Sequence, residues 1–439
     1  MVSMTRNIIS VFTLCLIVVL TACKPKYEAT IPEQGEMNPQ RFVMIGGGHA
    51  GGYMDDALTH KSQMNSVANI IAEQFRTVGG GIFNQPLISQ NSGGISMAGL
   101  SPFMLGYKTD CKNVSSLSPV RIATGGDLTI WNDNVYNSSN KFGNFGIPGL
   151  KLMEVSSNTY GSVNPFFNRM TSGASASVLD NAIAADPTFF SVFLGIEDVM
   201  DFAKSGGKNS NLPSTASFEA AYTNLVQVMK ANGAKGVLAT IPDVTQMPYF
   251  TTIPWNGLNL DETNVTTLNN IYNPLGFYFD LGSNPFMIED PSANDFSVRQ
   301  ILDGELILLS VPLDSVKCNQ MGVLFPLRSE FVLTLPEIEV LRNQIQAYNT
   351  IIKNIAALNN LALVETEKFA QNLSDGFVYN GISMSAKFVS GGAYSLDGIH
   401  FNAKGNALLA NEFIKSINKK YKSTLHQVNT GNFGATLFP

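Results

Sequence analysis

The stretch SLDGIHFNAKG, residues 395–405, contains an aspartate and a histidine separated by two residues. An amphipathic pattern follows it and predicts a helix over residues 404–421. An imidazole held by a carboxylate is the pair that activates a nucleophilic hydroxyl, because the carboxylate keeps the ring in the required tautomer. The chain has only four histidines, so one in this setting is informative. Asp397 and His400 are therefore candidates for an orienting acid and a general base.

Upstream of this stretch, short apolar runs alternate with amphipathic helical patterns, which is typical of a parallel α/β sheet. Strands are predicted at 41–45, 188–194, 236–241 and 361–364, and the main helices around 64–75, 218–233, 334–355 and 404–421. The helix at 334 begins with a capping box formed by Thr334 and Glu337. Residues 243–333 form an insertion rich in aromatic residues and too long for an ordinary loop. It could be a lid over a ligand groove or a partner-facing surface, while each aromatic by default packs within the insertion's own core.

The overall composition excludes two classes of protein. The 439 residues are 44% hydrophobic and only 14% charged, so most of the chain can bury a core and is not disordered. The net charge is −6, with 28 basic against 34 acidic side chains. We therefore expect no nucleic-acid partner, because binding to phosphates needs a basic surface.

The N-terminus indicates export. Arg6 precedes an apolar run over residues 8–20, which is too short to span a bilayer but suits a signal peptide. The run ends in Leu-Thr-Ala-Cys, which resembles a bacterial lipobox, with Cys23 as the acylated (palmitate-bearing) first residue of the mature protein. We predict a signal peptide at 1–22, a tether at 23–40 and a lipid anchor in a bacterial outer membrane. The alternative is an ordinary secretory signal with an incidental cysteine.

Two further cysteines, Cys111 and Cys318, follow the predicted anchor. An oxidising envelope permits a disulfide between them, and two buried thiols are the alternative.

The glycine run at residues 46–51, GGGHAG, follows a predicted strand and matches the dinucleotide-binding pattern GxGxxG. Its context does not fit a dinucleotide. Asp55 and Asp56 would repel a phosphate, and Glu73, the acid at the expected offset, falls within a helical pattern. We expect no cofactor.

Taken together, these motifs resemble the conserved blocks of the SGNH/GDSL hydrolase family, in particular its long bacterial lipoproteins. The pair at 397 and 400 matches the last block, residues 144–149 (NFGIPG) match the second, residues 195–198 (GIED) the third, and residues 46–49 the first. The resemblance implies a three-layer α/β/α, flavodoxin-like domain over 41–422 with a central parallel sheet, followed by a tail at 423–439. It also implies that the backbone N–H of Gly149 would face an oxyanion.

The chain departs from the family at its chemical positions. Gly48 stands at the position of the nucleophilic serine, Gly47 at that of the aspartate before it, and Glu197 at that of the asparagine that donates to the oxyanion. Loss of the nucleophile typically costs about a millionfold in turnover. A carboxylate at 197 removes an oxyanion donor worth about 3 to 4 kcal/mol.

Several roles remain open for the residues that are left. The glycines could serve only the turn after the first strand, His400 and Asp397 could form only a structural hydrogen bond, and Glu197 could pair with His400. We expect no metal ion; the alternative is that Glu197, His400 and Asp397 form a remodelled pocket that binds a cation or activates water. His49 as a replacement nucleophile is disfavoured, because the family residue at that position packs behind the turn.

We therefore expect a catalytically degenerate, SGNH-hydrolase-like outer-membrane lipoprotein that acts as a binding or accessory subunit of an envelope complex. Its expected partners are an integral outer-membrane barrel protein or complex, or an acyl or glycan ligand. The alternative is an active ester, lipid or acylated-glycan hydrolase with a rearranged site.

Overall fold

The computed structural model describes residues 31–208, 212–293 and 296–439. The chain divides into Met1–Pro32 and Glu33–Pro439, and the second unit contains every element described below. The predicted signal peptide, 1–22, and the predicted lipid attachment at Cys23 lie outside the described residues. Within the described part, no helix is both long enough and apolar enough to cross a membrane.

A sheet of five parallel strands forms the centre of the unit, in the order β13-β6-β5-β1-β4. The strands are β1 (Phe42–Gly46), β4 (Asn144–Gly146), β5 (Phe189–Phe193), β6 (Lys235–Ala239) and β13 (Ala362–Val364). Every residue of β1 and β5 is buried, as expected for central strands covered on both faces. The apolar runs correctly predicted all of these strands except β4, whose sequence Asn-Phe-Gly contains only one apolar side chain.

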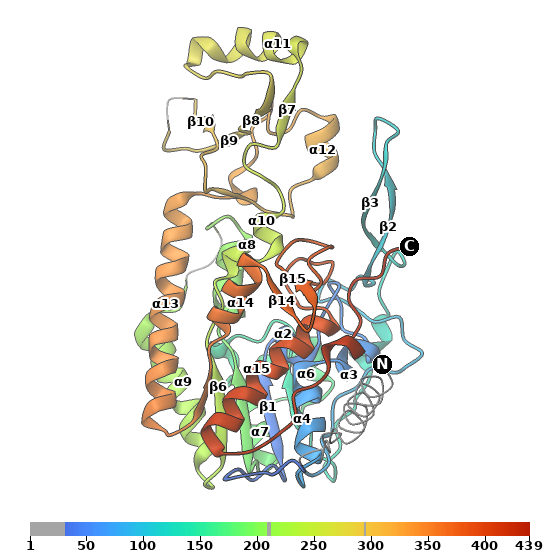
Figure 1. Ribbon diagram of the computed structural model, residues 1–439, viewed down its shortest axis with the longest axis vertical. Coiled ribbons are helices and arrows are strands. Elements are labelled where there is room, and N and C mark those ends of the chain that lie inside the picture. The colour runs from blue at the N-terminus through green and yellow to red at the C-terminus, as the bar shows by residue number, and fades with distance from the viewer. Residues whose placement is uncertain (1–30, 209–211, 294–295) are drawn as a thin grey trace, which may run out of the picture. The chain divides into compact units, whose positions relative to one another are not determined.

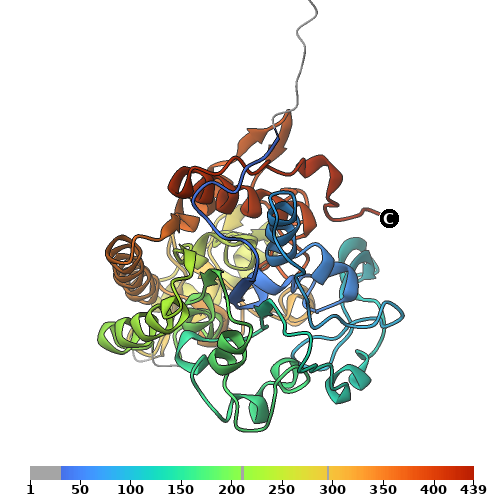
Figure 2. The ribbon, with the colours of Figure 1, turned by 90° about the horizontal axis from the view of Figure 1, so that it is seen from below.

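Helices cover both faces of the sheet and complete the predicted three layers. Helices α4 and α15 pack against each other on one face, and α9 and α13 pack against each other on the opposite face (Figure 2). The helices are α2 (Gly48–Gly51), α3 (His60–Met64), α4 (Val67–Arg76), α5 (Tyr160–Val163), α6 (Pro165–Asn168), α7 (Val178–Ala184), α8 (Ile196–Lys204), α9 (Thr215–Lys230), α10 (Pro248–Thr251), α11 (Glu262–Tyr272), α12 (Leu313–Cys318), α13 (Leu335–Leu358), α14 (Thr366–Asp375) and α15 (Ala403–Tyr421).

The aromatic-rich insertion forms small clusters of its own. One cluster is built around Phe286, Ile288 and Leu327, and another around Tyr272 and Phe279. Its elements gather above the sheet in Figure 1, and its backbone is joined to the 395–400 loop where the N–H of Tyr249 donates to the carbonyl of Gly398 (2.9 Å). Many of the insertion's aromatics therefore pack internally, although Tyr249 and Phe250 belong to the main core.

Short two-stranded pieces make up the remaining sheet structure. They pair β2 (Phe103–Thr109) with β3 (Ser115–Arg121), β7 (Leu258–Leu260) with β8 (Gly282–Asn284), β9 (Met287–Glu289) with β10 (Val298–Gln300), β11 (Leu306–Ile307) with β12 (Val332–Leu333), and β14 (Phe377–Tyr379) with β15 (Ile382–Met384). A disulfide joins Cys111, in the turn of the β2–β3 hairpin, to Cys318 at the end of α12, with the Cα atoms 6.2 Å apart.

Both ends of the domain differ from the boundaries expected from sequence. From Glu33 onward the expected tether is packed against the domain: Met37 is buried, and the N–H of Glu36 donates to the carbonyl of Tyr421 (2.7 Å). The expected tail is also partly integrated, because Leu425 and Thr430 are buried. Prolines and mixed charge suggested a linker at residues 24–40. Backbone hydrogen bonds to α15, between Glu36 and Tyr421 and between Lys404 and Gly434, hold both segments in place.

Candidate functional site

The candidate site lies at the carboxyl edge of the parallel sheet, where β1, β4 and β5 end. The glycine run makes the turn from β1 into α2. Glycine is needed in this turn because larger residues would collide with the neighbouring strands. A Cβ on Gly51 would lie 2.0 Å from the carbonyl oxygen of Gly146, and one on Gly46 would lie 2.9 Å from that of Phe193. The glycines are therefore required by the packing of this edge, and they bring α2 close to the ends of β4 and β5.

Asp397 and His400 form the pair expected from their spacing. His400 Nδ1 lies 3.0 Å from Asp397 Oδ2, and the other carboxylate oxygen accepts from the backbone N–H groups of Ile399 and His400, both at 2.8 Å. Burial opposes ionisation of Asp397, but His400 and these donors outweigh it and hold the pKa of Asp397 well below its usual range. Burial also works against charge on His400, yet Asp397 and then Glu197 raise its pKa.

Position 48 faces the base, as a nucleophile would. A Cβ built on Gly48 would lie 2.6 Å from His400 Nε2 and 3.0 Å from the Cβ of Tyr53. The imidazole therefore lies against the bare backbone and takes the space that a serine side chain would need. The structure thus brings position 48 and His400 together and leaves the general base without a hydroxyl at that position.

Gly149 follows β4 and adopts a left-handed conformation with φ of +78°. Within the described residues no acceptor takes its backbone N–H. The loop is held by Asn164, whose amide donates to the carbonyl of Pro148 (2.9 Å). The N–H of Gly149 is therefore not used by the fold within the described residues, as the resemblance would require of an oxyanion donor.

Glu197 lies in the first turn of α8, beside the glycine run. A Cβ on Gly47 would lie 3.3 Å from Glu197 Oε1. Burial raises the pKa of Glu197, and the nearby His400 partly offsets this. The one ion pair of His400 within the described chain is with Asp397, so the suggested pair between Glu197 and His400 is not formed.

His49 is the member of the site that the sequence did not place there. Its Nε2 lies 3.1 Å from the carbonyl oxygen of Ile399, its Nδ1 is buried without a partner, and its ring centroid is 4.5 Å from that of His400. Burial lowers the pKa of His49 to about 3, so the ring is neutral. One ligand atom each from His49, Glu197 and His400 lie within 4.8 Å of one another, a spacing that could hold a metal ion. The scarcity of histidines was the available signal.

A polar network supports the pair from behind and was also missed from sequence. The hydroxyl of Tyr53, whose ring packs against His400, donates to Asp56 (3.0 Å), and Asp56 pairs with Arg121. The backbone N–H of Asp56 donates to Asp397 Oδ2 (3.0 Å). The signal in the sequence was the Asp55-Asp56 pair, which served there only as an argument against a phosphate.

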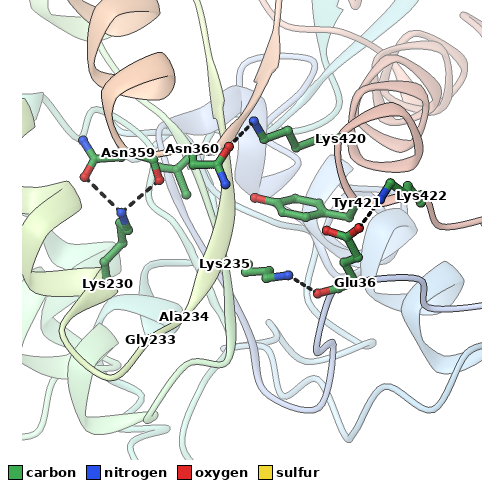
Figure 3. Close-up of a pocket in the computed structure, with 11 residues that line it drawn as sticks. Glu36, Lys230, Gly233, Ala234, Lys235, Asn359, Asn360, Lys420, Tyr421 and Lys422 are labelled. Carbon is green, nitrogen blue, oxygen red and sulfur yellow. Dashed lines mark hydrogen bonds and ion pairs between the residues drawn. The ribbon is translucent and has the colours of Figure 1, made fainter.

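A second hollow lies at the opposite edge of the sheet, where β6 begins (Figure 3). Four lysines surround it: Lys230, Lys235, Lys420 and Lys422. Each donates to an oxygen of the chain, on Asn359, Glu36, Asn360 and Glu36 respectively. Each lysine that lines this hollow is therefore already hydrogen-bonded within the chain.

A family model described as GDSL-like Lipase/Acylhydrolase matches residues 113–413, which include Gly149, Glu197, Asp397 and His400 but not the glycine run. No curated protein matches the chain. A solved structure described as the lipase/acylhydrolase from Enterococcus faecalis matches at 12% identity and a TM-score of 0.34, covering 89% of this chain and 100% of that one.

Proposed function

The chain belongs to the GDSL-like lipase/acylhydrolase family, and from this premise we propose that it is a catalytically degenerate member that binds a ligand or partner and does not form an acyl-enzyme. In this proposal it is a lipoprotein, anchored in a bacterial outer membrane through Cys23, and a binding or accessory subunit of an envelope complex. The partner would be an outer-membrane barrel protein or complex, or an acyl or glycan ligand bound at the candidate site.

The observation that supports this proposal is the geometry at position 48. Serine hydrolysis requires a hydroxyl between the base and the substrate carbonyl. Here the imidazole of His400 lies directly against the backbone of Gly48, so the base has no nucleophile to activate. Glu197 lies beside the glycine run, and its ionised carboxylate would place negative charge where the family pattern has an oxyanion donor.

The second candidate function is hydrolysis of an ester, lipid or acylated glycan by a rearranged site. The intact Asp397–His400 pair favours it, as does the N–H of Gly149, which has no acceptor in the part of the chain that the structure describes. In that case His400 would act on water instead of on a serine.

Ester hydrolysis by the full chain, purified in detergent, separates the two functions. We expect no turnover of short- or long-chain nitrophenyl esters, either in the presence of a metal chelator or with added zinc. The loss of the nucleophile is expected to lower turnover about a millionfold. The matched variants are His400→Ala and His60→Ala. His60 is a suitable control because it lies outside the site, where its ring is hydrogen-bonded to the carbonyl oxygen of Ile88.

Wild-type turnover that disappears in His400→Ala and survives in His60→Ala would refute the binding proposal. Activity confined to Gly48→Ser would support it, since only the missing hydroxyl would then separate the chain from a hydrolase. Because any side chain introduced at position 48 must displace the His400 ring, we expect such a gain to be small.

A further inference from the structure

We propose that His49, Glu197 and His400 bind one zinc ion, at the place where the family pattern has its serine and asparagine. This inference goes beyond the proposed function and does not depend on it. The three residues come from separate elements: His49 from α2, Glu197 from α8 and His400 from the loop before α15. Their ligand atoms lie within 4.8 Å of one another, so small side-chain movements would bring them onto a common ion.

The hydrogen bonds determine which nitrogen each histidine offers. A carbonyl oxygen can only accept, so His49 Nε2 carries the proton that it donates to Ile399, and the buried Nδ1 keeps a free lone pair. The carboxylate of Asp397 likewise takes the proton of His400 Nδ1, so Nε2 is the nitrogen that can bind an ion once it is deprotonated. Both rings thus offer a lone pair with the opposite nitrogen held by an oxygen, the arrangement typical of zinc-binding histidines.

Glu197 supplies the third ligand. The residue is only partly exposed, and among the described residues no hydrogen bond or ion pair ends on its carboxylate. An unpaired carboxylate is costly to withdraw from water, so a cation at this point would remove a penalty that the chain otherwise carries. The lysines that act on it are Lys204 and Lys151, and Lys151 is already paired with Asp201.

The charge of the site suits a divalent ion. Histidine binds a metal ion only as the neutral imidazole and glutamate as the carboxylate, so in the bound state Glu197 and Asp397 would contribute two negative charges against an ion of charge +2. Two imidazoles and one carboxylate are ligands that zinc accepts, and three protein ligands leave a position for water or for a ligand oxygen.

The departures from the family pattern all serve this arrangement. A side chain at position 48 would lie against His400 Nε2, the nitrogen with the free lone pair, and a side chain at 47 would lie against Glu197. Glycine at both positions keeps the two ligands accessible. Replacement of an amide by a carboxylate at 197 converts a hydrogen-bond donor into a metal ligand.

Zinc binding by the full chain, purified in detergent without a histidine tag, tests the proposal. We expect one zinc per chain by elemental analysis, displaced competitively by a chromophoric chelator, and the visible absorption of a tetrahedral site when Co²⁺ replaces zinc. Glu197→Gln, nearly isosteric, and His49→Gln should each abolish this stoichiometric binding. His60→Gln, whose histidine lies outside the cluster, should bind as the wild type does.

Two further variants probe the surroundings of the site. Asp397→Asn should weaken zinc affinity by about 10- to 100-fold, as expected for loss of a carboxylate that orients a ligating histidine. Gly48→Ser should also weaken it, because the new side chain crowds Nε2. Far-ultraviolet circular dichroism shows whether each variant is folded, and Glu197→Gln is the variant least expected to disturb packing.

Absence of stoichiometric zinc in the wild type would overturn the proposal. So would zinc that is retained in folded Glu197→Gln and His49→Gln, because the ion would then lie elsewhere. Neither result bears on ester hydrolysis, which is measured separately, so failure of the metal site and failure of the proposed function can be distinguished.

Discussion

Asp55 is a partly buried acid behind the candidate site, in an unusual backbone conformation. Its φ is +55°, its Oδ1 accepts from the N–H of Leu396 (2.9 Å), and its own N–H donates to Ser395 (2.9 Å). These bonds hold the turn after α2 to the loop that carries Asp397 and His400. Burial raises the pKa of Asp55 to about 6, so the residue stabilises the geometry of the site at an electrostatic cost.

Asp55→Asn should therefore raise stability at high pH. A carboxyl whose pKa is higher in the folded than in the unfolded state favours folding at low pH, and this contribution is lost as the pH rises from about 4 through about 6. Asparagine tolerates positive φ and keeps the acceptor for Leu396. We expect the free energy of unfolding at pH 8 to exceed that of the wild type by about 2 to 3 kcal/mol, with the difference shrinking towards pH 4.

Urea unfolding at several pH values measures this difference. Asp303→Asn, at an exposed position, is the control and should show no comparable trend. A constant or increasing gap between Asp55→Asn and the wild type as the pH falls would contradict the assignment.

At the level of elements, the long helix α13 shows what a local pattern can predict. Its capping box was visible in the sequence, and in the structure Glu337 Oε2 accepts from both the backbone N–H and the hydroxyl of Thr334, each at 2.8 Å. The helix also carries the predicted apolar stripe, which packs against α9. Such features depend on residues three or four apart and are therefore readable without the fold.

Thr334→Ala removes the cap and should lower the free energy of unfolding by about 1 kcal/mol. Thr350→Ala is the matched control, because Thr350 is exposed in the middle of the same helix. We expect it to be neutral or slightly stabilising, since alanine has the higher helix propensity. Equal effects of the two substitutions in chemical unfolding would show that the cap contributes nothing specific.

At the scale of the whole molecule, the proposed anchor decides where the domain works. Chemical unfolding and ligand binding do not report on it, but fractionation does. We expect the wild-type chain to sediment with outer membranes and to resist extraction by high salt, because at least two acyl chains on Cys23 would give stable attachment. Cys23→Ser should release the folded chain into the soluble fraction.

Mass spectrometry of the N-terminal peptide checks the same prediction directly. An unmodified Cys23 in membrane-bound protein, or a Cys23→Ser chain that stays in the membrane fraction, would rule out lipid anchoring at this residue.

Much of the fold was predictable because its signals are local. The buried strands appeared as apolar runs, and the Asp397–His400 pair needs only a three-residue separation in one loop. The β4 strand and the packed ends of the domain were missed. These segments are held in place by residues that are distant in the chain, as in the hydrogen bond between Glu36 and Tyr421.

The amino-acid sequence alone determined the three-layer fold, the order of its motifs and the absence of a serine at position 48. Only the tertiary structure decided what surrounds that glycine. The parallel order β5-β1-β4 brings the ends of these strands together and places His49, Glu197 and His400 within reach of one another. That convergence depends on strand pairing and on close backbone contacts, such as that between Gly51 and Gly146, and no periodicity in the sequence encodes it.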